Sequence, residues 1–158
     1  MNGPVELVVF ILDGRRFAIS LSSVERVIRP VEVTPLPKAP DIVSGVINLQ
    51  GTIAPVFNLR KRFGLPEKAI GLGDQMIVAR TSGRTVSFGV DEVERVLEFP
   101  YEKIVPREKI HPEMEYVEGV IKLEDGMVLI HDIDRFLSLD EKKALGAAIK
   151  KKRARRAR

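Results

Sequence analysis

The residues best suited to proton transfer in this chain of 158 residues are two histidines. His131 is followed by Asp132, and a neighbouring carboxylate can orient an imidazole as a general base. His111 stands before Pro112 in a charged segment. No cysteine occurs, and neither histidine is accompanied by a nucleophile candidate or by ligands at a metal-binding spacing. We therefore expect both histidines to be structural, and we expect no catalytic residue, no cofactor and no metal site.

The densest group of carboxylates runs from Asp91 to Glu98. Its spacing is not that of a calcium-binding loop. On a β-strand, Glu92, Glu94 and Glu98 have the same parity, so their side chains would project from one face. We interpret the group as the solvated face of a strand.

Positive charge gathers in two places, Arg60–Arg62 and the C-terminal tail. The formal charge is +4, but seven cations lie between residues 150 and 158, so residues 1–149 are left with −3. The tail is a candidate contact for a polyanion, which leaves nucleic acid, anionic lipid and acidic protein surfaces open. The alternative is a solvated helix end, and no aromatic residues interleave the tail for base stacking. Its cations are Lys150, Lys151, Lys152, Arg153, Arg155, Arg156 and Arg158.

Most of the remaining chain has the pattern of β-strands. Large apolar side chains alternate with small ones along residues 17–21, as in a half-buried strand. Asp13-Gly14 and Gln50-Gly51 separate such runs and predict hairpins, because glycine accepts a positive φ. Pro55 lies inside the run Ile53–Leu59. Proline cannot donate to a ladder, so we expect an edge strand there, or a backbone position that faces outward.

An internal repeat predicts the domain organisation. Residues 24–28, Val-Glu-Arg-Val-Ile, recur as Val-Glu-Arg-Val-Leu at residues 93–97, an offset of 69. Residues 45–49, Gly-Val-Ile-Asn-Leu, recur as Gly-Val-Ile-Lys-Leu at residues 119–123, an offset of 74. We expect an all-β fold with two similar five-stranded lobes, at about residues 5–66 and 74–139, in one domain spanning residues 1–139.

Residues 140–158 are expected to form a short helix and the basic tail. Ser138 or Asp140 would cap a helix from Glu141 to about Lys152. The segment after Gly146 is expected to bury almost no apolar surface, and the extreme end should fray. The longest apolar run near the start, Leu7–Leu12, is far shorter than a membrane span and does not follow a basic signal-peptide region. We therefore expect a cytoplasmic protein.

Several short motifs follow one another in a definite order. They are Pro35–Pro40, Gly45–Gly51, Pro55–Arg60, Val90–Val93, Gly119–Leu123 and Leu129–Ile133. Together they resemble the CheW family of chemotaxis adaptor proteins, and the resemblance covers Leu7 to Leu139. It implies two SH3-like β-barrels packed together, in agreement with the repeat. It also implies a non-enzymatic adaptor that couples methyl-accepting chemoreceptors to a CheA-type histidine kinase.

The resemblance further implies two sets of binding residues. The positions that match the kinase contact are Val33, Thr34, Leu36 and Pro37. Those that match the receptor groove are Val24, Arg26, Ile28 and Gln50. Because Val33 and Leu36 stand beside a proline-rich loop, we expect them to form a small exposed apolar patch.

Three positions depart from the family pattern. Gln50 stands where arginine is usual, Arg26 where glutamate is usual, and Asn58 where aspartate is common. Glutamine lacks the two-pronged donor of arginine, and arginine in place of glutamate reverses a charge. We therefore expect an altered receptor choice, as in a divergent chemosensory array. The alternative from another functional class is a nucleic-acid-associated β-barrel that uses its basic tail.

Overall fold

The computed structural model describes residues 3–81, 83–110 and 117–156, and most of its elements are strands. The strands are β1 (Val5–Leu12), β2 (Arg15–Ser20), β3 (Val24–Ile28), β4 (Val43–Leu49), β5 (Thr52–Phe57), β6 (Gln75–Thr81), β7 (Arg84–Val90), β8 (Glu92–Phe99), β9 (Val105–Pro106), β10 (Val117–Leu123) and β11 (Gly126–His131). The helices are α1 (Leu59–Arg62), α2 (Arg107–Ile110) and α3 (Leu139–Arg156), with 3₁₀ turns η1 (Leu21–Ser23), η2 (Tyr101–Lys103) and η3 (Ile133–Arg135). The predicted all-β class is confirmed.

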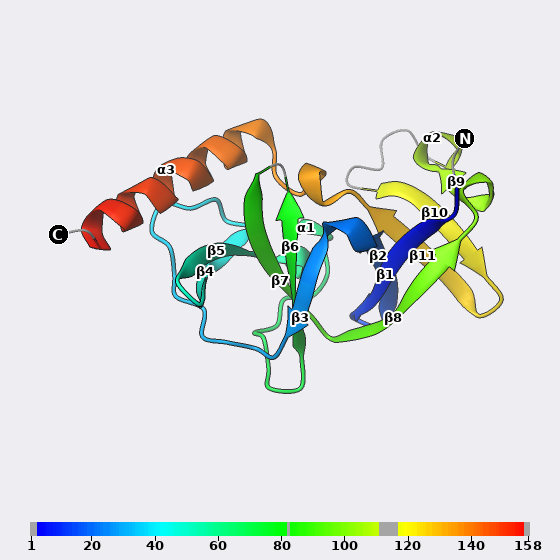
Figure 1. Cartoon of the computed structure of the whole chain (residues 1–158), viewed down its shortest axis with the longest axis horizontal. Coiled ribbons are helices and arrows are strands. Elements are labelled where there is room, and N and C mark those ends of the chain that lie inside the picture. The colour runs from blue at the N-terminus through cyan, green and yellow to red at the C-terminus, as the bar shows by residue number, and fades with distance from the viewer. Residues whose placement is uncertain (1–2, 82, 111–116, 157–158) are drawn as a thin grey trace.

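The strands form two sheets, and Figure 1 shows them side by side with α3 at one end of the molecule. Sheet A has the order β8-β1-β2-β11-β10-β9, and sheet B has the order β3-β6-β7-β5-β4. Each sheet mixes strands from both halves of the chain, because hairpin β1–β2 pairs with β8 and hairpin β6–β7 pairs with β3. The lobes predicted at residues 5–66 and 74–139 are wrong in this respect. After hairpin β1–β2, the turn η1 leads the chain from sheet A into sheet B. After hairpin β6–β7, Asp91 leads it from sheet B into sheet A.

The two halves nevertheless share their backbone irregularities. β3 has a bulge at Glu25 where it pairs with β6, and β8 has one at Glu94 where it pairs with β1. β4 and β10 have bulges at Ser44 and Glu118. The parallel pairing of β5 with β7 also recurs, as that of β11 with β2. Since bulges are specific features of a strand, the repeat extends from the sequence to the backbone.

A glycine follows the bulge in β4 and the bulge in β10, because another segment of backbone passes close to each. A Cβ on Gly45 would overlap the carbonyl of Thr34, and one on Gly119 would lie 2.8 Å from Cγ2 of Ile104. Thr34 and Val46 each donate an N–H to the other's carbonyl oxygen, both at 2.8 Å. β9 makes the corresponding contact with β10. Only glycine leaves room for this approach.

Both predicted hairpin turns are present. Asp13 and Gly14 have φ of 53° and 72°, and Gln50 and Gly51 have φ of 51° and 96°. Two successive positive φ values are typical of the type I′ turn that joins twisted antiparallel strands. Gln50 is thereby placed at the tip of the β4–β5 hairpin.

Pro55 does not lie on an edge strand, because β5 stands between β7 and β4. It opposes Val46, whose N–H and carbonyl are bonded to Thr34 on the other side. The missing N–H of proline therefore falls where this pair of strands makes no ladder bond. The predicted edge position is wrong, and the local register explains how the proline is accommodated.

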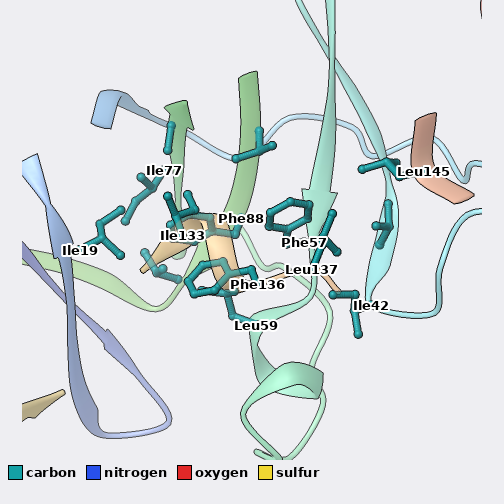
Figure 2. Packing of buried hydrophobic residues seen from close by; sticks show 14 of the residues in the cluster. Ile19, Ile42, Phe57, Leu59, Ile77, Phe88, Ile133, Phe136, Leu137 and Leu145 are labelled. Carbon is teal, nitrogen blue, oxygen red and sulfur yellow. The ribbon is translucent and has the colours of Figure 1, made fainter. Parts of the chain in front are cut away.

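The largest hydrophobic cluster takes side chains from both sheets and from α3. Figure 2 shows Phe57, Phe88 and Phe136 close together within it. The ring centroid of Phe136 lies 6.3 Å from that of Phe57 and 6.1 Å from that of Phe88, in edge-to-face arrangements. Such pairs add to the free energy gained by burial. A smaller cluster belongs to each sheet, around Ile121 in sheet A and around Ile47 in sheet B.

α3 begins with a capping box and is packed on one side. The Ser138 hydroxyl oxygen accepts the N–H of Glu141 at 3.1 Å, and the Glu141 carboxylate accepts the N–H of Ser138 at 2.8 Å. Leu145, Ala148 and Ile149 are buried in the largest cluster. The expectation of little apolar packing is therefore wrong, because these three side chains share one helical face.

Candidate protein-interaction site

The segment between β3 and β4 contains the four residues predicted to meet the kinase. Thr34 and Pro37 are exposed, whereas Val33 is half-buried and Leu36 is only 8% exposed. The expected apolar patch of Val33 and Leu36 is wrong, because the backbone bridge to β4 holds the segment against sheet B. The segment instead exposes Thr34, Pro37 and the side chain of Val31.

β3 carries three of the four residues predicted to meet the receptor. The bulge at Glu25 changes the direction of successive side chains. Val24 therefore packs against the largest cluster, while Ile28 packs against the cluster of sheet B. Arg26 is exposed on β3, and Gln50 is exposed at the tip of β4–β5. The four side chains thus do not share a single face.

A groove of about 700 Å³ adjoins the segment that follows β3. Pro30–Val33 lines one part of it, and Ile70, Gly89 and Val90 line another. Ile70 lies so close to Gly89 that a Cβ there would be 2.8 Å from its Cδ1 atom. Charged residues also line the groove, among them Arg60 and Asp91. An apolar part bordered by polar groups is typical of protein–protein contacts.

Arg60 ties together three parts of the chain beside this groove. Its Nη2 atom lies 2.7 Å and 3.0 Å from the two carboxylate oxygens of Asp91, and its Nη1 atom donates to the carbonyl of Pro66 at 2.9 Å. Asp91 also accepts the backbone N–H of Asp13 at 2.9 Å. Burial raises the pKa of Asp91, but the bonds from Asp13 and Arg60 outweigh this effect and hold the pKa below its ordinary value.

Arg60→Met is expected to lower the free energy of unfolding at pH 7 by about 2 kcal/mol, because Asp91 loses its cation while 29% exposed. The lowered pKa means that the ionised carboxylate stabilises the fold above about pH 4, and that this contribution is lost as the pH falls through the lowered value. The difference in the free energy of unfolding between Arg60→Met and wild type should therefore become smaller in acid. Urea denaturation at pH 7 and below pH 3 measures this difference. Arg80→Met is the control, since Arg80 and its partner Glu25 are both largely exposed. An equal loss in both variants would contradict the assignment.

Comparison with known proteins decides the family. Residues 6–141 match the CheW-like domain. This chain belongs to the CheW-like family. It is 29% identical over 145 residues to the chemotaxis protein CheW of Rhizobium meliloti, covering 90% of this chain and 94% of the relative. It is 32% identical over 132 residues to CheW of Thermotoga maritima, covering 84% and 87%.

A solved CheW-like structure shares the fold. The scaffolding protein TtCheW of Thermoanaerobacter tengcongensis superposes with a TM-score of 0.79 at 28% identity, covering 87% of this chain and 95% of the other. The two sheets described above are therefore the pair of SH3-like β-barrels that the resemblance predicts. These relatives give no support to the nucleic-acid alternative.

His131 is a packing residue in this CheW-like chain. It is buried, and its ring centroid lies 4.4 Å from that of Phe63 and 5.4 Å from that of Phe17. Asp132 caps η3, because its carboxylate accepts the backbone N–H of Asp134. His111 lies outside the described residues. The structure thus places Asp132 at a turn and His131 among aromatic rings.

The acidic run of the CheW-like domain divides into two kinds of residue. Glu92 and Glu98 are exposed, as predicted for a solvated strand face. Asp91 pairs with Arg60, and Glu94 pairs with Arg16 at 3.1 Å. Within residues 3–81, 83–110 and 117–156, no three His, Cys, Asp or Glu side chains are grouped to hold a metal ion. No helix in these ranges is long and apolar enough to cross a membrane.

The two basic clusters also differ from each other in the CheW-like domain. In α1, Arg60 pairs with Asp91 and Arg62 pairs with Glu141 at 2.7 Å, so two of its three cations are occupied inside the fold. In the tail, Lys150 and Lys151 are exposed and Lys152 is half-buried. Arg153, Arg155 and Arg156 belong to α3, but their side chains lie outside the described part, as does Arg158 altogether.

Proposed function

We propose that this chain is a non-enzymatic cytoplasmic adaptor that couples methyl-accepting chemoreceptors to a CheA-type histidine kinase. The observation that carries the proposal is the CheW-like match across residues 6–141. The matched relatives are named chemotaxis proteins, and the solved one is named a scaffolding protein. An adaptor acts by burying protein surface, for which about 800 Å² per partner is usual.

Kinase docking is assigned to the exposed part of the segment after β3. Thr34, Pro37 and Val31 provide its accessible surface. Val33 and Leu36 support this surface from below, since both are turned toward the interior. The groove beside Val31 enlarges the area that a partner can bury. The assignment thus keeps the predicted segment and changes which of its side chains touch the kinase.

Receptor docking is assigned to the exposed residues of the second set. Arg26 and Gln50 are accessible, and they are also the positions that depart from the family pattern. Charged and polar groups at an interface mainly determine partner choice and association rate. We therefore assign receptor selection to Arg26 and Gln50, with Val24 and Ile28 as partly buried support.

Two substitutions test these assignments and serve as controls for each other. Thr34→Arg should weaken binding to the regulatory domain of the CheA-type kinase from the same organism at least tenfold, because a bulky cation would enter the contact. It should leave binding to the receptor tip unchanged. Gln50→Arg should alter receptor affinity and leave kinase affinity unchanged. Isothermal titration calorimetry measures both affinities, with melting curves to verify the fold. If neither partner binds the wild-type chain, the adaptor proposal fails; if both bind but the variants have no selective effect, only the residue assignments fail.

A further inference from the structure

A second, smaller cavity lies beneath α3. Its volume is about 180 Å³, and it lies between the end of β5, the β6–β7 hairpin, η3 and the first turns of α3. Its apolar lining comes from side chains that are all 8% exposed or less. They are Phe57, Val86, Ile133, Leu137 and Leu145. Figure 2 shows Phe57, Ile133 and Leu137 near one another, with Leu145 approaching from α3.

The polar residues of this cavity carry more positive than negative charge. Arg84 and Lys142 line it together with Thr81, and Asp134 is the one carboxylate among the described lining residues. Arg84 is half-buried, and its Nη2 atom lies 3.8 Å from the place that a Cβ on Gly146 would occupy. The guanidinium thus reaches from β7 to α3 at the cavity.

Arg84 also lacks a balancing carboxylate. Among the described residues, no aspartate or glutamate forms an ion pair with it, whereas Arg16, Arg60 and Arg62 all have such partners. None of the Arg84 nitrogens is among the buried polar atoms without a partner, so its guanidinium stays in contact with solvent and can exchange water for an anion. An anion seated beside Arg84 would supply the missing partner, with the two-oxygen geometry that a guanidinium binds best.

We propose that this cavity binds a small organic acid, with its carboxylate on Arg84 and Lys142 and its short apolar body among Phe57, Val86 and Leu145. The size fits such a ligand. The volume equals that of several water molecules, at about 30 Å³ each, but it is below the roughly 300–1,000 Å³ of sites for drug-sized molecules. The bound acid contacts both β7 and α3, so it ties the helix to sheet B. This function lies outside the docking surfaces assigned above.

A titration with three probes tests the proposal. Hexanoate carries both the charge and the apolar chain, 1-hexanol carries only the chain, and acetate carries the charge with almost no chain. Methyl NMR spectra of the full chain should show saturable shifts at Val86, Ile133 and Leu145 with hexanoate. The dissociation constants for hexanol and acetate should be at least tenfold weaker, because each lacks one of the two contacts. Equal affinity for any two of the probes would overturn the proposal.

Two variants locate the site. Arg84→Gln should weaken hexanoate binding at least tenfold, and Lys142→Gln should weaken it several-fold. Arg80→Gln is the matched control, because Arg80 lies in the neighbouring strand, is exposed and does not line the cavity. The affinity of Arg80→Gln for hexanoate should equal that of the wild type. If Arg84→Gln fails to fold, Lys142→Gln decides. An unchanged affinity in the decisive variant, or an equal loss in Arg80→Gln, would show that the carboxylate does not sit between β7 and α3.

Discussion

Leu36→Asp is expected to destabilise the fold strongly, and not merely to remove kinase binding from a chain of wild-type stability. Leu36 belongs to the largest hydrophobic cluster and is 8% exposed, so a carboxylate there would be buried without a partner. The expected loss is about 4 kcal/mol or more, from the lost apolar contacts and the unpaired charge together. Such a loss is comparable with the roughly 5–15 kcal/mol that stabilises a typical domain. Circular dichroism during urea denaturation measures it.

Pro37→Asp is the matched control, because it places the same charge one residue further along on an exposed side chain. It should change the free energy of unfolding by less than about 1 kcal/mol. If Pro37 contributes to kinase docking, this variant also reduces kinase affinity while it remains folded. A Leu36→Asp variant with the wild-type free energy of unfolding would contradict the burial of Leu36. A Pro37→Asp variant as unstable as Leu36→Asp would show that the whole segment is intolerant of charge.

Gly45→Val is expected to cost about 3 kcal/mol and to detach the segment after β3 from β4. Gly45 has a φ of 157°, and a Cβ at this position would overlap the carbonyl of Thr34. The two backbone hydrogen bonds between Thr34 and Val46 therefore cannot persist in the variant. The segment that carries the proposed kinase contact would then lose its support. Hydrogen exchange at the amides of Thr34 and Val46 reports the detachment directly, and urea denaturation gives the overall loss.

Gly73→Val serves as the control for this substitution. A Cβ on Gly73 meets nothing within 4 Å, and Gly73 does not have a positive φ. Its variant should have nearly the wild-type free energy of unfolding and full exchange protection at Thr34. Gly119→Val should cost less than Gly45→Val, because its Cβ would first meet the Ile104 side chain, at 2.8 Å, and Gly119 does not have a positive φ. If Gly45→Val keeps its protection at Thr34, the close approach does not require glycine.

The sequence predicts the local features of the fold well, because those features depend on neighbouring residues. Positive φ at Asp13-Gly14 and Gln50-Gly51 follows from turn chemistry, and both hairpins are present. The partner of β3 could not be predicted in the same way. Alternation of apolar residues shows that residues 24–28 form a strand, but it does not say whether that strand pairs with β1 or with β6. The exchange of β3 and β8 between the sheets depends on long-range contacts.

The segment around Thr34 stays a prediction from the family resemblance. The direction of Val33 and Leu36 could not be predicted in this way, because it depends on the bridge to β4. The bond between Arg60 and Asp91 was missed because the two residues are 31 positions apart in the chain. A signal was present in the repeat, since Asp91 stands where the first half has Ser22, at the same offset of 69. That difference marks a place where the two halves are not equivalent.

The exchange of strands between the sheets has a mechanical consequence for the proposed adaptor. Val8 pairs with Val96 in one sheet, and Val27 pairs with Ile77 in the other, so the chain crosses between the barrels and is hydrogen-bonded on both sides. Neither barrel can open without pulling apart strands supplied by both halves of the chain. A displacement imposed on one barrel is therefore passed to the other through these hydrogen-bonded strands. Under the proposed function, such stiffness would allow a small movement at the receptor contact to reach the kinase contact.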